Sequence, residues 1–352
     1  MNYHKSDIRN ILIWLFLVGI LALFTVILGG YTRLTGSGLS ITEWKPVTGL
    51  FLPLTDHAWS VEFNKYKISP EYIQINFDMN LNEFKRIFLI EYIHRILARS
   101  IFIIFVIPGF FFIFLKKIKI DKYLVIIFLA ILLQGFIGWY MVKSGLINKP
   151  HVSHYRLAIH FILALFLCNV IFFRFLYYKD LYLAKKILLK RNKISQNIFI
   201  IFIVFYFLFL VQVILGCFVA GLKAGLIYNS YPMMGDGIIP TEINFSIIKI
   251  SQIFSDAVYI QFFHRIMAML LIICSFFFSL YSFFFIKNKN FRFCMNLLFI
   301  TILIQFFVGV LTLLFSIPVA LALFHQIWAL MISFMYVYIF YLFFFIYNNG
   351  QI

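Results

Sequence analysis

The chain has 352 residues, of which 63% are hydrophobic and 12% are charged, and its mean hydropathy is +0.98. This composition excludes a water-soluble globular protein, a collagen, a disordered chain and a disulfide-rich scaffold. The net charge of +17 would suit a nucleic-acid partner, but in a membrane protein an uneven distribution of basic residues between the two sides explains it without one.

Eight apolar runs are long enough to cross a membrane, because a hydrocarbon layer needs about 20 apolar residues per helix. In chain order, we expect helices at 11–30, 87–115, 123–142, 156–178, 196–220, 258–286, 293–315 and 318–346. The connector at about 31–86 is polar and balanced in charge, so we expect it to cap the helices with short helical stretches. The predicted fold class is all-α, a polytopic membrane protein with eight transmembrane helices.

The connectors alternate in charge along the chain. The N-terminus and the connectors after the second, fourth and sixth helices carry 16 basic and 3 acidic residues, whereas the other set carries 11 basic and 9 acidic residues. Cytoplasmic loops hold the excess of Lys and Arg. We therefore expect a multi-pass protein of the bacterial inner membrane with both termini in the cytoplasm, in contact with lipid and with no nucleic acid.

The first four helices resemble the last four in sequence. Residues 26–29 match 213–216, and residues 91–96 match 261–266. Since each repeat has an even number of helices, both copies keep the same orientation. This predicts two parallel-repeat four-helix bundles, residues 1–180 and 181–352, related by a pseudo-twofold axis along the membrane normal.

Four of the eight histidines lie at a similar depth inside the second, fourth, sixth and eighth helices, near their outer ends. They are His94, His160, His264 and His325. The other four lie in loops or at helix starts, where water satisfies them: His4, His57, His151 and His154. Ionisable groups within a membrane are costly and usually functional.

Several roles for these four histidines compete. Packing histidines would need no common depth, a proton path would favour staggered depths and more acids than Glu91, and a zinc site would need further ligands. Axial ligation of haem iron needs one His on each of two facing helices at one level. We favour paired ligation, His94 with His160 and His264 with His325.

The two halves differ at one position beside these histidines. The first half has Glu91 and the second has Gln261, each three residues before its His and so on the same helical face. A carboxylate beside a haem can exchange protons or stabilise a developing cation, which an amide does less well. A structural role for Glu91, paired with Arg95 or Arg156, is the alternative.

Basic residues and glycines surround the predicted haem sites. Arg95 and Arg265, which directly follow a ligand His, are candidates for haem propionates, and equally for backbone carbonyls or lipid headgroups. We add Arg33 and Lys223 to the candidate propionate contacts. The glycines either let the backbone approach a bulky ligand or end a helix, and helix ending is the reading we prefer. They are Gly29, Gly30, Gly36, Gly38, Gly216, Gly221 and Gly225.

Five segments together resemble the haem A synthase family over essentially all eight helices. They are GGYTRLTGSGLSITEWKP at 29–46, EYIHR at 91–95, SHYRLAIH at 153–160, QFFHR at 261–265 and HQIW at 325–328. No cysteine occurs before Cys168. The chain is therefore similar to the alphaproteobacterial and mitochondrial branch, which lacks the cysteine pair that some members carry in the first outer loop.

The resemblance implies an oxidoreductase that converts haem O into haem A for cytochrome oxidase. The C8 methyl group of haem O would be hydroxylated successively to a geminal diol, which loses water to leave a formyl group. In that family the substrate haem O binds between residues matching His94 and His160 with Glu91 catalytic, and the residues matching His264 and His325 hold a haem B cofactor. Both sites would lie toward the periplasm.

The resemblance also implies partners: haem O synthase, cytochrome oxidase assembly factors and an electron acceptor that the sequence does not identify. A homo-oligomer is an open alternative. Two other classes of function compete, namely a di-haem b-type cytochrome that exchanges electrons with quinone, and a haem transporter or chaperone. The haem types that the protein releases would discriminate among these three.

Overall fold

The computed structural model describes residues 4–45, 48–118, 120–147, 149–183, 196–244 and 250–347. Pro46 of the first quoted segment lies outside these ranges, as do Lys119 and the basic residues from 185 to 193 that enter the charge comparison. Every helix and turn described below belongs to the ranges just given, and no β-strand forms within them.

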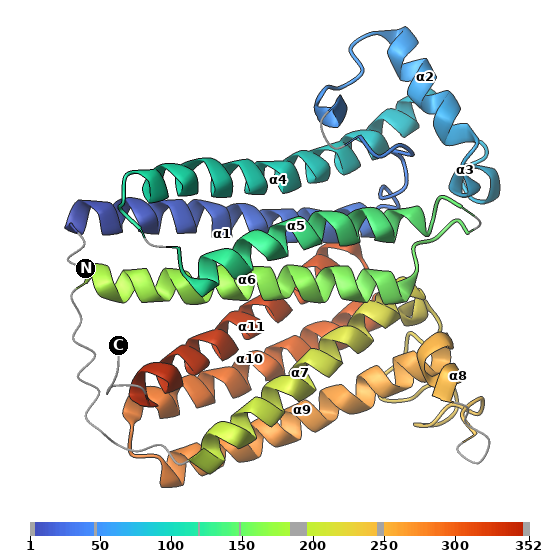
Figure 1. Ribbon diagram of the computed structural model, residues 1–352. Coiled ribbons are helices and arrows are strands. Elements are labelled where there is room, and N and C mark those ends of the chain that lie inside the picture. The colour runs from blue at the N-terminus through green and yellow to red at the C-terminus, as the bar shows by residue number, and fades with distance from the viewer. Residues whose placement is uncertain are drawn as a thin grey trace. The chain divides into compact units, whose positions relative to one another are not determined.

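Eight long helices confirm the predicted fold class, and each is long and apolar enough to cross a membrane. Their bounds are α1 Lys5–Leu34, α4 Leu81–Phe114, α5 Lys122–Lys143, α6 His154–Tyr182, α7 Gln196–Gly221, α9 Ala257–Phe285, α10 Lys289–Leu314 and α11 Val319–Tyr347 (Figure 1). All eight overlap the ranges expected from the apolar runs. Their apolar length explains this agreement, because a span must satisfy its backbone groups internally.

Polar residues set several of the helix ends. At the start of α4 the Asn80 side chain accepts hydrogen bonds from the backbone N–H groups of Asn82 and Glu83, and the Glu83 carboxylate accepts one from the Asn80 N–H. This reciprocal pairing satisfies donors that the first turn of a helix leaves free. At the end of α1, Gly36 takes a φ of 65°, a conformation that glycine adopts without a Cβ penalty.

The chain forms two compact units, residues 1–171 and 172–352, with the boundary inside α6. The predicted boundary after residue 180, the parallel repeat and its axis stay predictions.

In the first unit α1 packs along α4, and α4 contacts α5. Trp14 of α1 donates its indole N–H to the Ile104 carbonyl of α4 at 2.8 Å, which fixes the register of these two helices.

The connector between α1 and α4 holds two short helices and a 3₁₀ turn, as the sequence predicts. These are η1 Thr48–Leu50, α2 Asp56–Lys67 and α3 Pro70–Gln74, and they lie beyond the N-terminal end of α4 (Figure 1). Tyr66 packs with Phe63, Phe84 and Phe88 in an aromatic cluster and donates its hydroxyl to Glu71 at 3.0 Å. Burial, reinforced by Glu71, raises the pKa of Tyr66, so this hydroxyl remains a donor.

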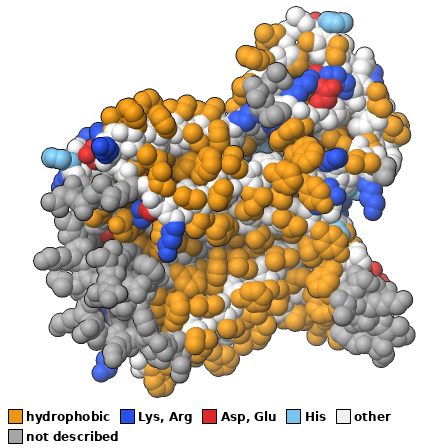
Figure 2. Space-filling model, viewed as in Figure 1, with side chains coloured by type: hydrophobic (Ala, Val, Ile, Leu, Met, Phe, Trp, Pro, Cys, Tyr) orange, Lys and Arg blue, Asp and Glu red, His pale blue; other side chains and the backbone are white. Residues whose placement is uncertain are grey.

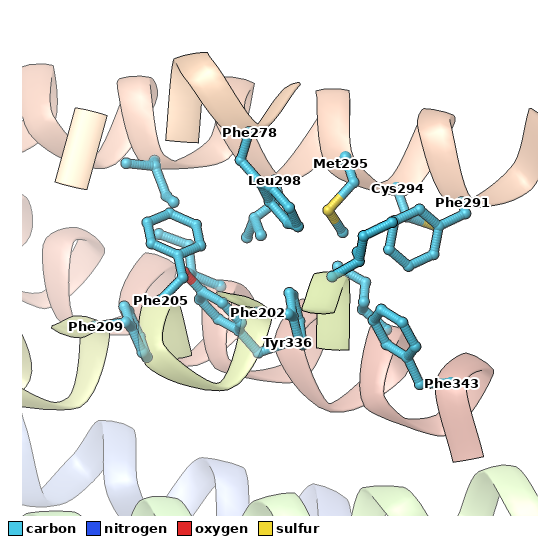
Figure 3. Close-up of a cluster of buried hydrophobic side chains, with 14 of the residues drawn as sticks. Phe202, Phe205, Phe209, Phe278, Phe291, Cys294, Met295, Leu298, Tyr336 and Phe343 are labelled. Atoms are coloured by element: carbon cyan, nitrogen blue, oxygen red, sulfur yellow. The ribbon is translucent and has the colours of Figure 1, made fainter. Parts of the chain in front are cut away.

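In the second unit α7 contacts α9 and α11, and α10 contacts α9 and α11. An aromatic core fills the interior of these four helices, with Phe202 and Tyr336 fully buried at its centre and Phe291 and Phe343 stacked edge to face at 4.9 Å (Figure 3). Two shorter elements connect α7 to α9: η2 Ala224–Leu226 and α8 Ile250–Ser255.

Hydrophobic side chains cover the long helices on the face shown in Figure 2, and charged side chains gather near helix ends and over α2. Exposed Phe, Ile and Leu are frequent on these helices, for example Phe110, Phe207 and Phe277. An apolar exterior is unfavourable in water and is expected in lipid. The composition of the surface therefore agrees with a multi-pass membrane protein.

Candidate functional site

Within residues 1–171, each predicted ligand histidine lies against a glycine of the preceding long helix. A Cβ built on Gly29 of α1 would lie 2.9 Å from Cε1 of His94 on α4. A Cβ on Gly138 of α5 would lie 3.1 Å from Cε1 of His160 on α6. Both distances are shorter than an ordinary van der Waals contact, so these imidazoles occupy the space that a side chain would fill.

The second unit repeats this arrangement. A Cβ built on Gly216 of α7 would lie 3.2 Å from Cε1 of His264 on α9, and one on Gly309 of α10 would lie 2.9 Å from Cε1 of His325 on α11. Gly29 and Gly216 are therefore inside helices and provide close approach. The expectation that glycines end helices holds for Gly36 and Gly221, but it is wrong for Gly29 and Gly216, because a Cβ there would collide with an imidazole.

Within each unit the two histidines of a predicted pair lie near enough for their charges to interact, His160 with His94 and His264 with His325. Their pairing as ligands stays a prediction. Among the described residues, no group of three or more His, Cys, Asp and Glu side chains is placed to hold a metal ion. Two imidazoles suit the axial positions of haem iron, whose other four ligands come from the porphyrin, whereas a zinc site would need more protein ligands.

Several imidazole nitrogens are buried without a hydrogen-bond partner. They are Nδ1 of His94, of His264 and of His325. A buried ring nitrogen with no partner is costly. These orphaned nitrogens, two imidazoles per unit and the glycine-lined approach fit a group that supplies a metal.

Three glutamines contact the ligand histidines from the preceding helix. The side-chain amide donates to the backbone carbonyl of the His: Gln134 to His160 at 3.1 Å, Gln212 to His264 at 3.1 Å and Gln305 to His325 at 3.0 Å. The sequence does not predict any of them as site residues. A signal exists, however, because each stands four residues before the glycine that faces the same His, one helical turn away.

Glu91 is buried, with 2% of its surface exposed, and four donors surround its carboxylate. Ser40 donates its hydroxyl to Oε2 at 2.6 Å, and the Ile41 N–H donates to the same oxygen at 2.9 Å. Arg95 donates to Oε1 through Nε at 3.0 Å and Nη2 at 2.6 Å. The ion pair between Glu91 and Arg95, which a structural role for Glu91 would require, is therefore present. Charge-assisted donors on both oxygens stabilise a carboxylate anion at this position.

Gln261, which replaces Glu91 in the second half, meets an acceptor instead. Its amide N–H donates to the Tyr228 carbonyl at 2.9 Å, and it is as deeply buried as Glu91. The groups that surround each side chain therefore suit its chemistry. Donors surround the residue in the first half, and a carbonyl faces it in the second.

Arg95 and Arg265 bind equivalent carbonyls of the connectors before their helices. Arg95 donates through Nη2 to the Ile41 carbonyl at 3.0 Å. Arg265 donates through Nη2 to the Tyr228 carbonyl at 2.9 Å and through Nη1 to the Ser230 carbonyl at 3.0 Å. Both arginines therefore contact backbone carbonyls, which was one of their predicted roles. Their role toward haem propionates stays a prediction.

The remaining basic candidates lie elsewhere. Arg156 donates to the Tyr140 carbonyl at 2.7 Å and stacks on the Tyr140 ring, so the described contacts give Glu91 only Arg95 as an ion-pair partner. Lys223 is exposed just after α7, with a φ of 53°, and Arg33 is half-buried near the end of α1. Both stay candidates for propionate contacts.

The contact between Gly138 and His160 can be tested with two substitutions in helix α5. We expect Gly138→Ala to displace His160 and to lower haem retention in the first unit about tenfold, a typical cost of disturbing the support of a metal ligand. Gly135→Ala is the matched control, because a Cβ there meets nothing within 4 Å. The haem-to-protein ratio after purification measures the effect, and equal ratios for the two variants would contradict it.

The chain is similar over nearly its whole length to known proteins. The sequence profile of the COX15-CtaA family, described as cytochrome oxidase assembly protein, matches residues 12–337. The chain is 40% identical over 326 residues to a haem A synthase of Wolbachia pipientis wMel, covering 92% of this chain and 89% of the relative. It is 39% identical over 343 residues to one of Rickettsia prowazekii, covering 94% and 97%, and 42% identical over 329 residues to one of Rickettsia bellii, covering 92% and 95%.

Proposed function

Because the chain belongs to the COX15-CtaA family of cytochrome oxidase assembly proteins, we propose that it oxidises the C8 methyl group of haem O to the formyl group of haem A. Its relatives from Wolbachia and Rickettsia are haem A synthases and match nearly its whole length. The chain is accordingly a haem A synthase by function, an oxidoreductase, and a multi-pass membrane protein. The site residues, the bound haem types and the orientation in the membrane are the proposal.

The paired imidazoles are the observation that carries the site assignment. His94 and His160 would hold the substrate haem O, and His264 and His325 would hold a haem B cofactor. Each pair lies within one unit, each imidazole faces a glycine, and three of the four leave Nδ1 without a partner. When bound, haem B supplies one-electron redox chemistry.

Glu91 is the proposed catalytic residue, because it is the carboxylate nearest in sequence to a ligand of the substrate haem. It lies one turn from His94 on the same helix, and Ser40, Ile41 and Arg95 fix both of its oxygens. A fixed negative charge can stabilise positive charge that develops on the substrate, and a carboxylate can accept the proton that leaves during hydroxylation. Gln261 can do neither as well, which fits a second site that keeps its haem unchanged.

The connectors after α1 and α7 hold the outer ends of the sites. Arg95 ties the segment at Ile41 to α4, and Arg265 ties the segment at Tyr228 to α9. These bonds fix the connectors to the helices that carry His94 and His264, and a connector held there would limit the access of water to the bound substrate. Exclusion of water strengthens the electrostatic effect of Glu91.

The distribution of basic residues supports an orientation in a bacterial inner membrane with both termini in the cytoplasm and both haem sites toward the periplasm. Haem O synthase would supply the substrate, and assembly factors of cytochrome oxidase would receive the product. Each hydroxylation removes electrons from the substrate, so an acceptor is required. Haem B is a reasonable exit route for those electrons.

Analysis of the haems extracted from cells tests the proposed function. Cells that express the protein and supply haem O should yield haem A, measured by chromatography and by the pyridine haemochrome spectrum. Haem O that stays unmodified despite normal expression of the protein would overturn the proposal. Two tightly retained haem B groups without haem A would indicate an electron-transfer cytochrome, and haem O passed on unaltered would indicate a transporter.

A further inference from the structure

Three of the four ligand histidines are tied to the preceding helix by a glutamine side chain, and His94 is not. The bonds from Gln134, Gln212 and Gln305 to the histidine carbonyls measure 3.0–3.1 Å. The residue in the equivalent position before Gly29 is Thr25. Its hydroxyl donates to the Leu21 carbonyl of its own helix at 2.7 Å and so makes no bond to α4.

Other features of the four positions are shared and do not set His94 apart. Each histidine faces a glycine, and the contact at Gly29 is as short as that at Gly309. The difference is confined to the side-chain amide.

The amide has two consequences for the histidine that it touches. It fixes the backbone turn that carries the imidazole, and its amide nitrogen also lies 3.3–3.5 Å from the ring Nε2 of His160, His264 and His325. A polar group of the neighbouring helix that contacts a ligand imidazole holds the orientation of the ring. Thr25, whose hydroxyl donates to the Leu21 carbonyl, offers His94 no such donor.

We propose that His94 is the displaceable axial ligand of the substrate haem, because Thr25 replaces the glutamine that anchors the other three histidines. The proposal rests on the proposed function, since it takes haem to be the group between His94 and His160. With haem bound, His160 would keep it attached and His94 would release it. Glu91 lies one turn from His94 on the same helix. Thr25 and the three glutamines are positioning residues, because they act through the histidines.

Carbon monoxide is a suitable probe, because it binds ferrous haem only where an axial position opens. In the purified, reduced protein with both haems bound, we expect one haem to bind CO and the other to remain closed. Thr25→Gln should slow CO binding about tenfold, the lower end of the effect of a ligand-supporting residue. Thr25→Ser, which also lacks an amide, is the matched control and should bind CO like the unmodified protein.

The reverse exchange in the second unit keeps the test decisive if Thr25→Gln fails to fold. Gln212→Thr should open the His264 side, so that a second haem binds CO and the amount of CO bound per protein rises. Gln74→Thr, at an exposed position on α3, controls for the substitution itself. A closed first haem in the unmodified protein, or no change in CO binding with Gln212→Thr, would overturn the proposal. Haem A formation, measured on the same preparations, reports separately on the proposed function.

Discussion

Glu91→Gln should retain both haems and lose roughly a hundredfold or more of haem A formation, in the range that a catalytic acid or base contributes. The amide is nearly the same size as the carboxylate, but it carries no negative charge. It also presents an NH₂ group either to Arg95 or to the donors of Ser40 and Ile41, which all need an acceptor. The measurement is the haem A to haem O ratio at equal haem content.

A loss of stability must be separated from a loss of chemistry in this variant. Removing one partner of a buried ion pair can cost about 3–5 kcal/mol, so the thermal midpoint and the haem-to-protein ratio belong to the same experiment. Glu62→Gln is the control, because this carboxylate lies on α2 and pairs with Lys65 at 2.9 Å, away from the histidines. Unchanged product formation by Glu91→Gln would refute the catalytic assignment and leave the ion pair with Arg95 as its role.

His264→Ala and His325→Ala should each release the haem of the second unit, halving the haem-to-protein ratio, and should abolish haem A formation. An apolar slot binds haem iron weakly when one of two axial imidazoles is missing, and the proposed electron route is then interrupted. The substrate pair His94 and His160 is unaltered in these variants. Spectra of the reduced protein should therefore show that one haem remains.

The matched control for these variants is His57→Ala, since His57 is exposed on α2 and lies outside both predicted pairs. It should keep both haems and full product formation. If His264→Ala keeps two haems with unchanged spectra, the second pair is not an axial pair. If it keeps haem A formation after losing one haem, haem B is not the required exit route for electrons.

The relation between the two halves shows how far a sequence comparison extends. The match of Glu91 with Gln261 is visible in the sequence, and so is the match of Arg95 with Arg265. Their partners are not visible there. Arg95 and Arg265 were equal candidates for propionates and carbonyls, and only the path of each connector shows that carbonyls meet the guanidinium groups.

The sequence by itself determined the eight helices and the family, because apolar length and short motifs are local properties of the chain. The tertiary structure decided which atoms meet. It placed Gly29 and Gly216 against imidazoles instead of at helix ends, gave Glu91 donors and Gln261 an acceptor, and joined three glutamines to histidines while leaving Thr25 bound to its own helix. These outcomes depend on the register between neighbouring helices and on the course of the connectors, which no short stretch of sequence specifies.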